Sequence, residues 1–154
     1  MSSPVLLCTD GSDLSLAAVR AGVDVIDPAS TFVIVTVMDE PDPMLVTGGG
    51  LAGGVMSNEE FAQAEEAAAT EANEIIETSK ASLGLPDAGH QVLQGDPGSA
   101  ICRLADELSA RAIVLGSRGR GGLRRAVLGS VSDHVVRNAP CPVVVTGGHA
   151  VDED

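Results

Sequence analysis

The chain has 154 residues, of which 44% are hydrophobic, so we expect residues 1–154 to form a single globular domain. Its formal net charge is −13, which argues against nucleic acid or an anionic membrane as a partner because both would be repelled. Aromatic side chains are scarce, with two Phe and no Trp or Tyr. The core must therefore be aliphatic, and the aromatic platforms that bind single-stranded nucleic acid are missing.

Three widely spaced cysteines, Cys8, Cys102 and Cys141, match neither a disulfide framework nor a zinc pattern. We interpret them as small apolar packing groups in a reducing compartment. The sequence shows no signal peptide and no apolar run of membrane-spanning length. The expected location is therefore the cytoplasm.

The first third of the chain predicts a strand, a helix and a second strand. Residues 5–9 and 31–38 are apolar runs, the second rich in β-branched residues, as is typical of buried strands. Between them, Ser12 is a candidate N-cap and Pro28 ends the helical pattern. The face of this helix that we expect to meet the core has apolar residues at helical spacing: Leu14, Ala17, Ala18, Ala21 and Val25.

Residues 39–57 form a long loop with a glycine cluster at 48–54, which is too long for a plain connector. It is either a lid over a ligand or a flexible insertion, and we favour the insertion. Ser57 and Glu60 then fit a capping box, which predicts a helix reaching about Leu83. The glutamates of this helix predict a solvated face, and its inner stripe is Phe61, Ala64, Ala68, Ala72 and Ile75.

The rest of the chain alternates strands with helices. Residues 89–94 are short and partly polar, which predicts a strand at a sheet edge. Asp96 and Pro97 mark the start of the next helix. Its expected core face comprises Ile101, Leu104, Ala105 and Leu108. Residues 111–115 and 143–146 predict the fourth and fifth strands.

This alternation predicts a parallel sheet with helices on both faces. In such sheets, ligands bind beyond the carboxyl ends of the strands, where the strand order reverses. Polar, turn-prone segments follow the first strand, at residues 9–12, and the fourth, at residues 116–130. If these two strands are neighbours, both segments line one crevice.

The second of these segments has the composition of a phosphate site. Its glycines permit positive φ and close backbone approach, and Gly129-Ser130 opens a helix whose N-terminus favours an anion. It also carries four of the nine basic residues: Arg118, Arg120, Arg124 and Arg125. It is neither a Walker A loop nor a Gly-x-Gly-x-x-Gly motif after the first strand. A flexible glycine-arginine loop is the alternative interpretation.

Along nearly its whole length the chain resembles the universal stress protein family. Residues 9–12, Thr-Asp-Gly-Ser, look like the opening motif of that family. Gly116-x2-Gly119-x9-Gly129-Ser130 matches its nucleotide-binding signature without a gap. Residues 138–145, Asn-Ala-Pro-Cys-Pro-Val-Val-Val, are similar to its typical ending.

The resemblance implies an open five-stranded parallel sheet of order 3-2-1-4-5, of the adenine nucleotide alpha-hydrolase-like fold. It also implies ATP in the crevice with Mg²⁺ as counter-ion, and a homodimer formed through the fifth strand at Val143, Val144 and Val145. In this resemblance Asp10 meets the ribose or base, while Thr9 and Val37 flank the adenine. The full implied nucleotide-binding set is Thr9, Asp10, Val37, Leu115, Gly116, Gly119, Arg120, Gly129, Ser130, Val131 and Ser132.

We therefore predict an ATP-binding regulatory or stress-response module with little or no hydrolysis and no catalytic residue. His134 lies one helical turn after Ser130, and we interpret it as a surface or packing residue of the helix. A slow ATPase and a nucleotide-free homodimeric interaction module are the alternatives. An adenylate-forming enzyme is disfavoured, because residues 9–12 replace the Ser-Gly-Gly-x-Asp-Ser that such enzymes usually carry after the first strand.

Overall fold

A computed structural model of the chain describes residues 2–39, 56–117 and 128–147. In these residues, five strands form one parallel sheet in the order β3-β2-β1-β4-β5, which confirms the predicted topology. The strands are β1 (Val5–Cys8), β2 (Phe32–Val37), β3 (Gly89–Leu93), β4 (Ala112–Gly116) and β5 (Val143–Thr146). The helices are α1 (Asp13–Val23), α3 (Asn58–Leu83), α4 (Pro97–Glu107) and α5 (Ser130–Asn138).

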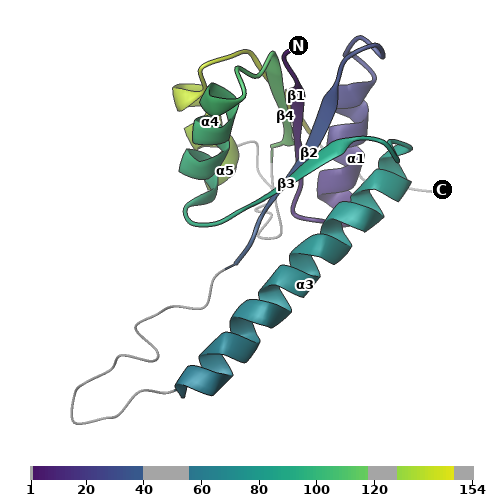
Figure 1. Ribbon diagram of the computed structural model, residues 1–154. Coiled ribbons are helices and arrows are strands. Elements are labelled where there is room, and N and C mark those ends of the chain that lie inside the picture. Colours follow the sequence, from purple (N-terminus) through teal and green to yellow (C-terminus); the bar gives the residue numbers. More distant parts are fainter. Residues whose placement is uncertain (1, 40–55, 118–127, 148–154) are drawn as a thin grey trace, which may run out of the picture.

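Helices cover both faces of the sheet, with α1 and α3 on one face and α4 and α5 on the other (Figure 1). Successive side chains of a strand point to opposite faces, and β1 shows this directly. Val5 and Leu7 pack toward α1 and α3, whereas Leu6 and Cys8 pack toward α4 and α5. Each face of the sheet therefore has its own aliphatic core, which explains why the strands are apolar on both sides.

The helix starts lie where the sequence predicts them. Ser12, Ser57 and Asp96 each accept a hydrogen bond from the backbone N–H three residues further on, as N-caps do. Glu60 completes the capping box of α3 by accepting from the Ser57 N–H. That hydrogen bond lowers the pKa of the Glu60 carboxyl.

The predicted inner face of α1 is wrong. The residues of α1 that are buried are Ser15, Leu16, Ala18, Val19 and Gly22, so only Ala18 was placed correctly. Val25 lies beyond the end of the helix and is 72% exposed. Small apolar residues occur around most of α1, so spacing alone does not choose a face. Leu108 was also misplaced, because it is the C-cap of α4 and is exposed.

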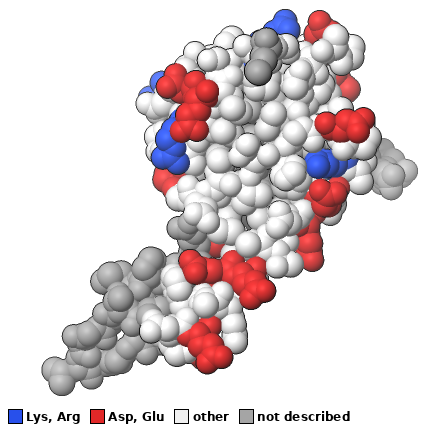
Figure 2. All heavy atoms as spheres, in the orientation of Figure 1, with Lys and Arg blue, Asp and Glu red and all other residues white. Residues whose placement is uncertain are grey.

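The long helix α3 touches the core only through its C-terminal half, where Ala72, Ile76 and Ser79 are buried. Its other half runs past the sheet (Figure 1), and Phe61 there is half-buried. The predicted solvated face is confirmed, and Figure 2 shows acidic side chains gathered along this part of the molecule. The exposed glutamates of α3 include Glu59, Glu65, Glu66, Glu74 and Glu77. Most of the loop predicted at residues 39–57 lies outside the described residues.

Within the described parts of the chain, no helix combines the length and the apolar character needed to cross a bilayer.

Gly22 provides a test of how α1 packs. A Cβ at this position would overlap with the side chain of Val114, a fully buried residue of β4. We expect Gly22→Ala to lower the free energy of unfolding by about 1–3 kcal/mol through overpacking. Urea denaturation measures the change, and Ala17→Ser on the exposed face of α1 is the control, expected to stay within about 0.5 kcal/mol of the wild type. Equal stabilities for the two variants would contradict this packing.

Candidate functional site

The candidate site lies at the carboxyl ends of β1 and β4, which are neighbours in the sheet. Cys8 of β1 aligns with Leu115 of β4, so Thr9 and Gly116 continue from the sheet at the same level. The chain then leaves β1 toward α1 on one face and leaves β4 toward α5 on the other face. This is the switch point of a doubly wound sheet. The expectation that the first and fourth strands are neighbours is confirmed, while residues 118–127 of the second polar segment lie outside the described residues.

The turn after β1 is held by its own side chains. The buried Thr9 Oγ1 accepts hydrogen bonds from the Gly11 N–H (3.1 Å) and the Ser15 hydroxyl (2.9 Å). Asp10 Oδ1 accepts from the N–H (2.9 Å) and the hydroxyl (2.6 Å) of Ser12. The half-buried Asp10 carboxylate is therefore fixed at the edge of the crevice before any ligand arrives.

Gly11 allows α3 to close over this turn. Its φ of 81° belongs to the left-handed region, and a Cβ on it would lie 2.8 Å from the Ile75 side chain of α3. Only glycine meets both demands without strain. The sequence pattern assigned Ile75 to the inner stripe of α3 but gave no sign that it packs against the turn that follows β1.

On the other side of the crevice, Ser117 fixes the start of α5. Its carbonyl oxygen accepts from the Gly129 N–H at 2.7 Å and from the Ser132 hydroxyl at 3.0 Å. Ser132 is 2% exposed and its hydroxyl also lies 3.0 Å from the Gly129 carbonyl oxygen. The single hydroxyl proton of Ser132 is thus directed to the backbone, while the Ser130 side chain is exposed. Sequence reasoning gave Ser117 no role, although it directly follows β4.

The N-terminus of α5 differs from those of the other three helices. Its N-cap, Gly129, offers no side-chain hydrogen bond, whereas α1, α3 and α4 are all capped by a side chain. The first helical bond runs from the Asp133 N–H to the Gly129 carbonyl. Within the described residues, the N–H groups of 130–132 therefore have no acceptor. Such a helix end attracts an anion through its free donors and its dipole.

The remaining predicted residues occupy different positions around the crevice. Val37 ends β2 and is half-buried, Gly116 ends β4, and Leu115 is buried in the core on the α4/α5 face, so only its backbone is available to a ligand. Gly119 and Arg120 lie outside the described residues.

Few ionisable groups lie in and near the described part of the site, since the four arginines of the second polar segment fall outside it. Burial raises the pKa of the Cys8 thiol to about 12, so this residue, next to Thr9, is a neutral packing group as predicted. The Asp133 carboxylate in the first turn of α5 pairs with Arg137 at 3.1 Å, which offsets its charge. In the described ranges, no three His, Cys, Asp or Glu side chains come together as metal ligands.

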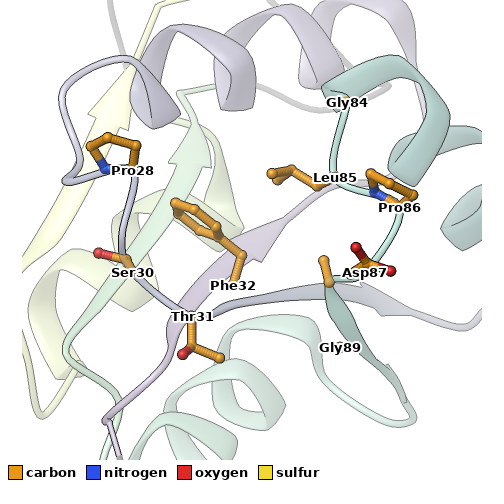
Figure 3. A pocket seen from close by; sticks show the side chains of 10 residues that line it. Pro28, Ser30, Thr31, Phe32, Gly84, Leu85, Pro86, Asp87 and Gly89 are labelled. Atoms are coloured by element: carbon orange, nitrogen blue, oxygen red, sulfur yellow. The ribbon is translucent and has the colours of Figure 1, made fainter.

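A separate surface cavity of about 320 Å³ lies at the opposite end of the sheet, where β2 and β3 begin (Figure 3). Phe32, Leu85 and two prolines give it apolar walls, and Asp87 is its charged lining residue. A carboxylate repels phosphate, and this end of a parallel sheet is not where such folds bind nucleotides. We therefore assign the candidate site to the β1/β4 crevice.

Comparison with known proteins agrees with the fold described above. The model of the universal stress protein family matches residues 1–147. A universal stress protein of Methanocaldococcus jannaschii is 30% identical over 143 residues, which cover 92% of this chain and 79% of that protein.

Solved structures of similar fold include some with a bound adenine nucleotide. One is a universal stress protein family protein of Arabidopsis thaliana with AMP bound, 17% identical, with a TM-score of 0.63 over 99% of this chain and 95% of that chain. Another is a universal stress protein in complex with cAMP, 24% identical, with a TM-score of 0.61 over 96% and 98% of the two chains. These likenesses support the fold, and the family match covers nearly all of the sequence. The chain belongs to the universal stress protein family.

Proposed function

We propose that this chain binds ATP in the crevice between β1 and β4 and acts as a single-domain regulatory module of the stress response. The main observation behind the proposal is the uncapped N-terminus of α5 at a switch point, where three backbone N–H groups have no acceptor among the residues that the structure describes. The AMP and cAMP of the two related structures share an adenosine and a phosphate group. Their presence supports an adenine nucleotide as the ligand.

In this proposal, the adenosine lies toward β1 and the phosphates lie toward α5. Asp10 receives the ribose or base, and Thr9 and Val37 flank the adenine. Gly116 and the first turn of α5, from Gly129 through Ser130 and Val131 to Ser132, receive the phosphates. The hydroxyl of Ser132 serves mainly to hold the helix start to Ser117, so we expect Ser132 to act on phosphate through its N–H.

Residues outside the described ranges complete the proposed site. By the sequence signature, Gly119 and Arg120 belong to the phosphate-binding loop. Mg²⁺ would be held mainly by the phosphates themselves, with Asp10 as the nearby carboxylate of the crevice. The proposed location is the cytoplasm, which suits the three free cysteines.

We propose no catalytic residue. His134, the histidine nearest to the phosphate end of α5 in the sequence, packs against Gly98 of α4, which is the second of the two interpretations given above, surface or packing. Binding without turnover is therefore the function we favour over a slow ATPase.

The free edge of β5 is the proposed dimer interface. Val143, Val144 and Val145 are all half-buried at this edge in one copy of the chain. The carbonyl groups of Pro142 and Thr146 accept from the N–H groups of Ile113 in β4 and of Ser117 just after it. The backbone groups of the odd-numbered residues of β5 therefore point away from the sheet. A second copy could pair with them.

Ser130→Pro tests the phosphate site. Ser130 is the first helical residue of α5 and follows a residue with φ −62° and ψ 164°, so proline fits there without disturbing the helix. It removes one N–H donor. We expect ATP affinity to fall about 10- to 100-fold by calorimetry, as for a lost hydrogen bond to a charged group. Ser130→Ala, which removes only the hydroxyl, is the control and should lose less. Absence of wild-type binding at millimolar ATP would overturn the proposal.

The fate of the nucleotide separates the three functions. We expect mass spectrometry of protein purified without added nucleotide to find ATP, and ADP release during incubation with ATP to be no faster than for Ser130→Pro. Faster release by the wild type would instead support a slow ATPase. A nucleotide-free preparation that also fails to bind added ATP would support the interaction module.

Val145→Pro tests the dimer. It removes an N–H that faces the free edge and leaves the bonds to β4 in place. We expect sedimentation to show a wild-type dimer and a variant dimer that dissociates at concentrations at least about tenfold higher. The reason is the loss of one hydrogen bond across the edge and the steric clash of the proline ring. Val25→Ala, on an exposed side chain outside the sheet, is the control. A variant as dimeric as the wild type would exclude pairing through this edge.

A further inference from the structure

We propose that the contact between His134 of α5 and Gly98 of α4 positions the phosphate-binding end of α5, so that these two residues control the affinity of the site for phosphate groups. The expected change in ATP affinity rests on the proposed function, whereas the expected effect on the position of α5 rests on the structure alone.

His134 lies so close to Gly98 that no side chain fits at position 98 without a shift. A Cβ on Gly98 would lie 2.7 Å from Cγ and Cδ2 of His134 and 2.8 Å from its Cβ. The Cβ of a helical residue moves only with its backbone, so rotation of the imidazole ring does not relieve the overlap. An ordinary contact is about 1 Å longer, because non-bonded carbon atoms pack at about 3.5–4.0 Å. With any side chain at position 98, α5 or α4 must therefore shift.

The α4 side of this contact is firmly held. Gly98 is buried in the first turn of α4, where Pro97 fixes the backbone and the Asp96 carboxylate accepts from the Ser99 N–H at 3.0 Å. That hydrogen bond is the main cause of the lowered pKa of Asp96, to which the nearby His134 adds a smaller contribution. The first turn of α4 thus forms a rigid surface for α5.

The α5 side connects the contact with the phosphate donors. Val135 holds α5 to the core and Ser132 ties its start to Ser117, so both of these anchors lie toward the sheet. His134 provides the lateral anchor against α4. It lies four residues after Ser130, and residues at this spacing share one face of a helix. A displacement at His134 is therefore transmitted to the end of the helix that carries the free N–H groups.

The chain also offers a way to separate this effect from general destabilisation. Alanine is a better helix former than glycine, so Gly98→Ala is harmful only because of the clash with His134. His134→Gly removes every His134 atom that the new methyl would hit, the Cβ included. The two substitutions should then compensate each other, which independent losses of stability would not do.

We expect Gly98→Ala to lower ATP affinity by at least about tenfold in calorimetry, because an error of about 1 Å in a positioned group has effects of up to about 100-fold. In the His134→Gly background, the same substitution should change affinity less than about twofold. Gly89→Ala is the matched control, since its Cβ would lie 3.4 Å from Val33 in ordinary contact. An equal loss in both backgrounds, or no loss in either, would overturn the inference.

NMR of the nucleotide-free protein tests the positioning without relying on the function. Gly98→Ala should shift the backbone N–H signals of 130–132, and the double variant should return them to those of His134→Gly. Unchanged signals would overturn the inference even if ATP binds. Shifted and restored signals in a protein that does not bind ATP would support the inference and refute the proposed function. If Gly98→Ala does not fold, His134→Gly alone should still move these signals, and a failure to do so also refutes the inference.

Discussion

The pairing of β1 with β4 is the constraint on which the rest of the structure depends. It places Cys8 level with Leu115, and the chain then leaves these two strands toward opposite faces of the sheet. The crevice at the switch point follows from this divergence. Both polar turns meet there because parallel strands end at the same edge, although more than a hundred residues separate them in the chain.

Small residues set the distances between the elements around this crevice. The chain has almost no aromatic side chains, and its helices instead approach neighbours at glycines. Gly11 admits Ile75, Gly22 admits Val114 and Gly98 admits His134. Close packing makes such contacts specific, because an added methyl has no void to enter. The positions of the helix ends, and so of the donors they carry, are fixed by the same contacts that stabilise the fold.

The contrast between α5 and the other helices connects stability with function. Three helices use a side chain to satisfy their first N–H groups, which stabilises them. In α5 the N-cap is Gly129, and Ser117 fixes the helix start without occupying the N–H groups of 130–132. The donors are thus oriented in advance, so a phosphate ligand would pay little to organise them. On a protein with a net charge of −13, such local main-chain donors would favour the proposed phosphate ligand despite the acidic surface.

The sequence by itself determined the order of the elements, the helix starts at Ser12, Ser57 and Asp96, and the glycine-serine start of α5. The order of the elements follows from hydrophobic periodicity, and the three capped starts depend on hydrogen bonds between residues three apart, so local pattern suffices. Only the tertiary structure decided which face of α1 is buried, that Ser117 holds α5, and that His134 rests on Gly98. Apolar residues occur on most sides of α1, so its own sequence does not choose the buried face. The contacts of Ser117 with α5 and of His134 with Gly98 join residues that are 12 to 36 positions apart in the chain. Their geometry exists only once the sheet has brought the helices together.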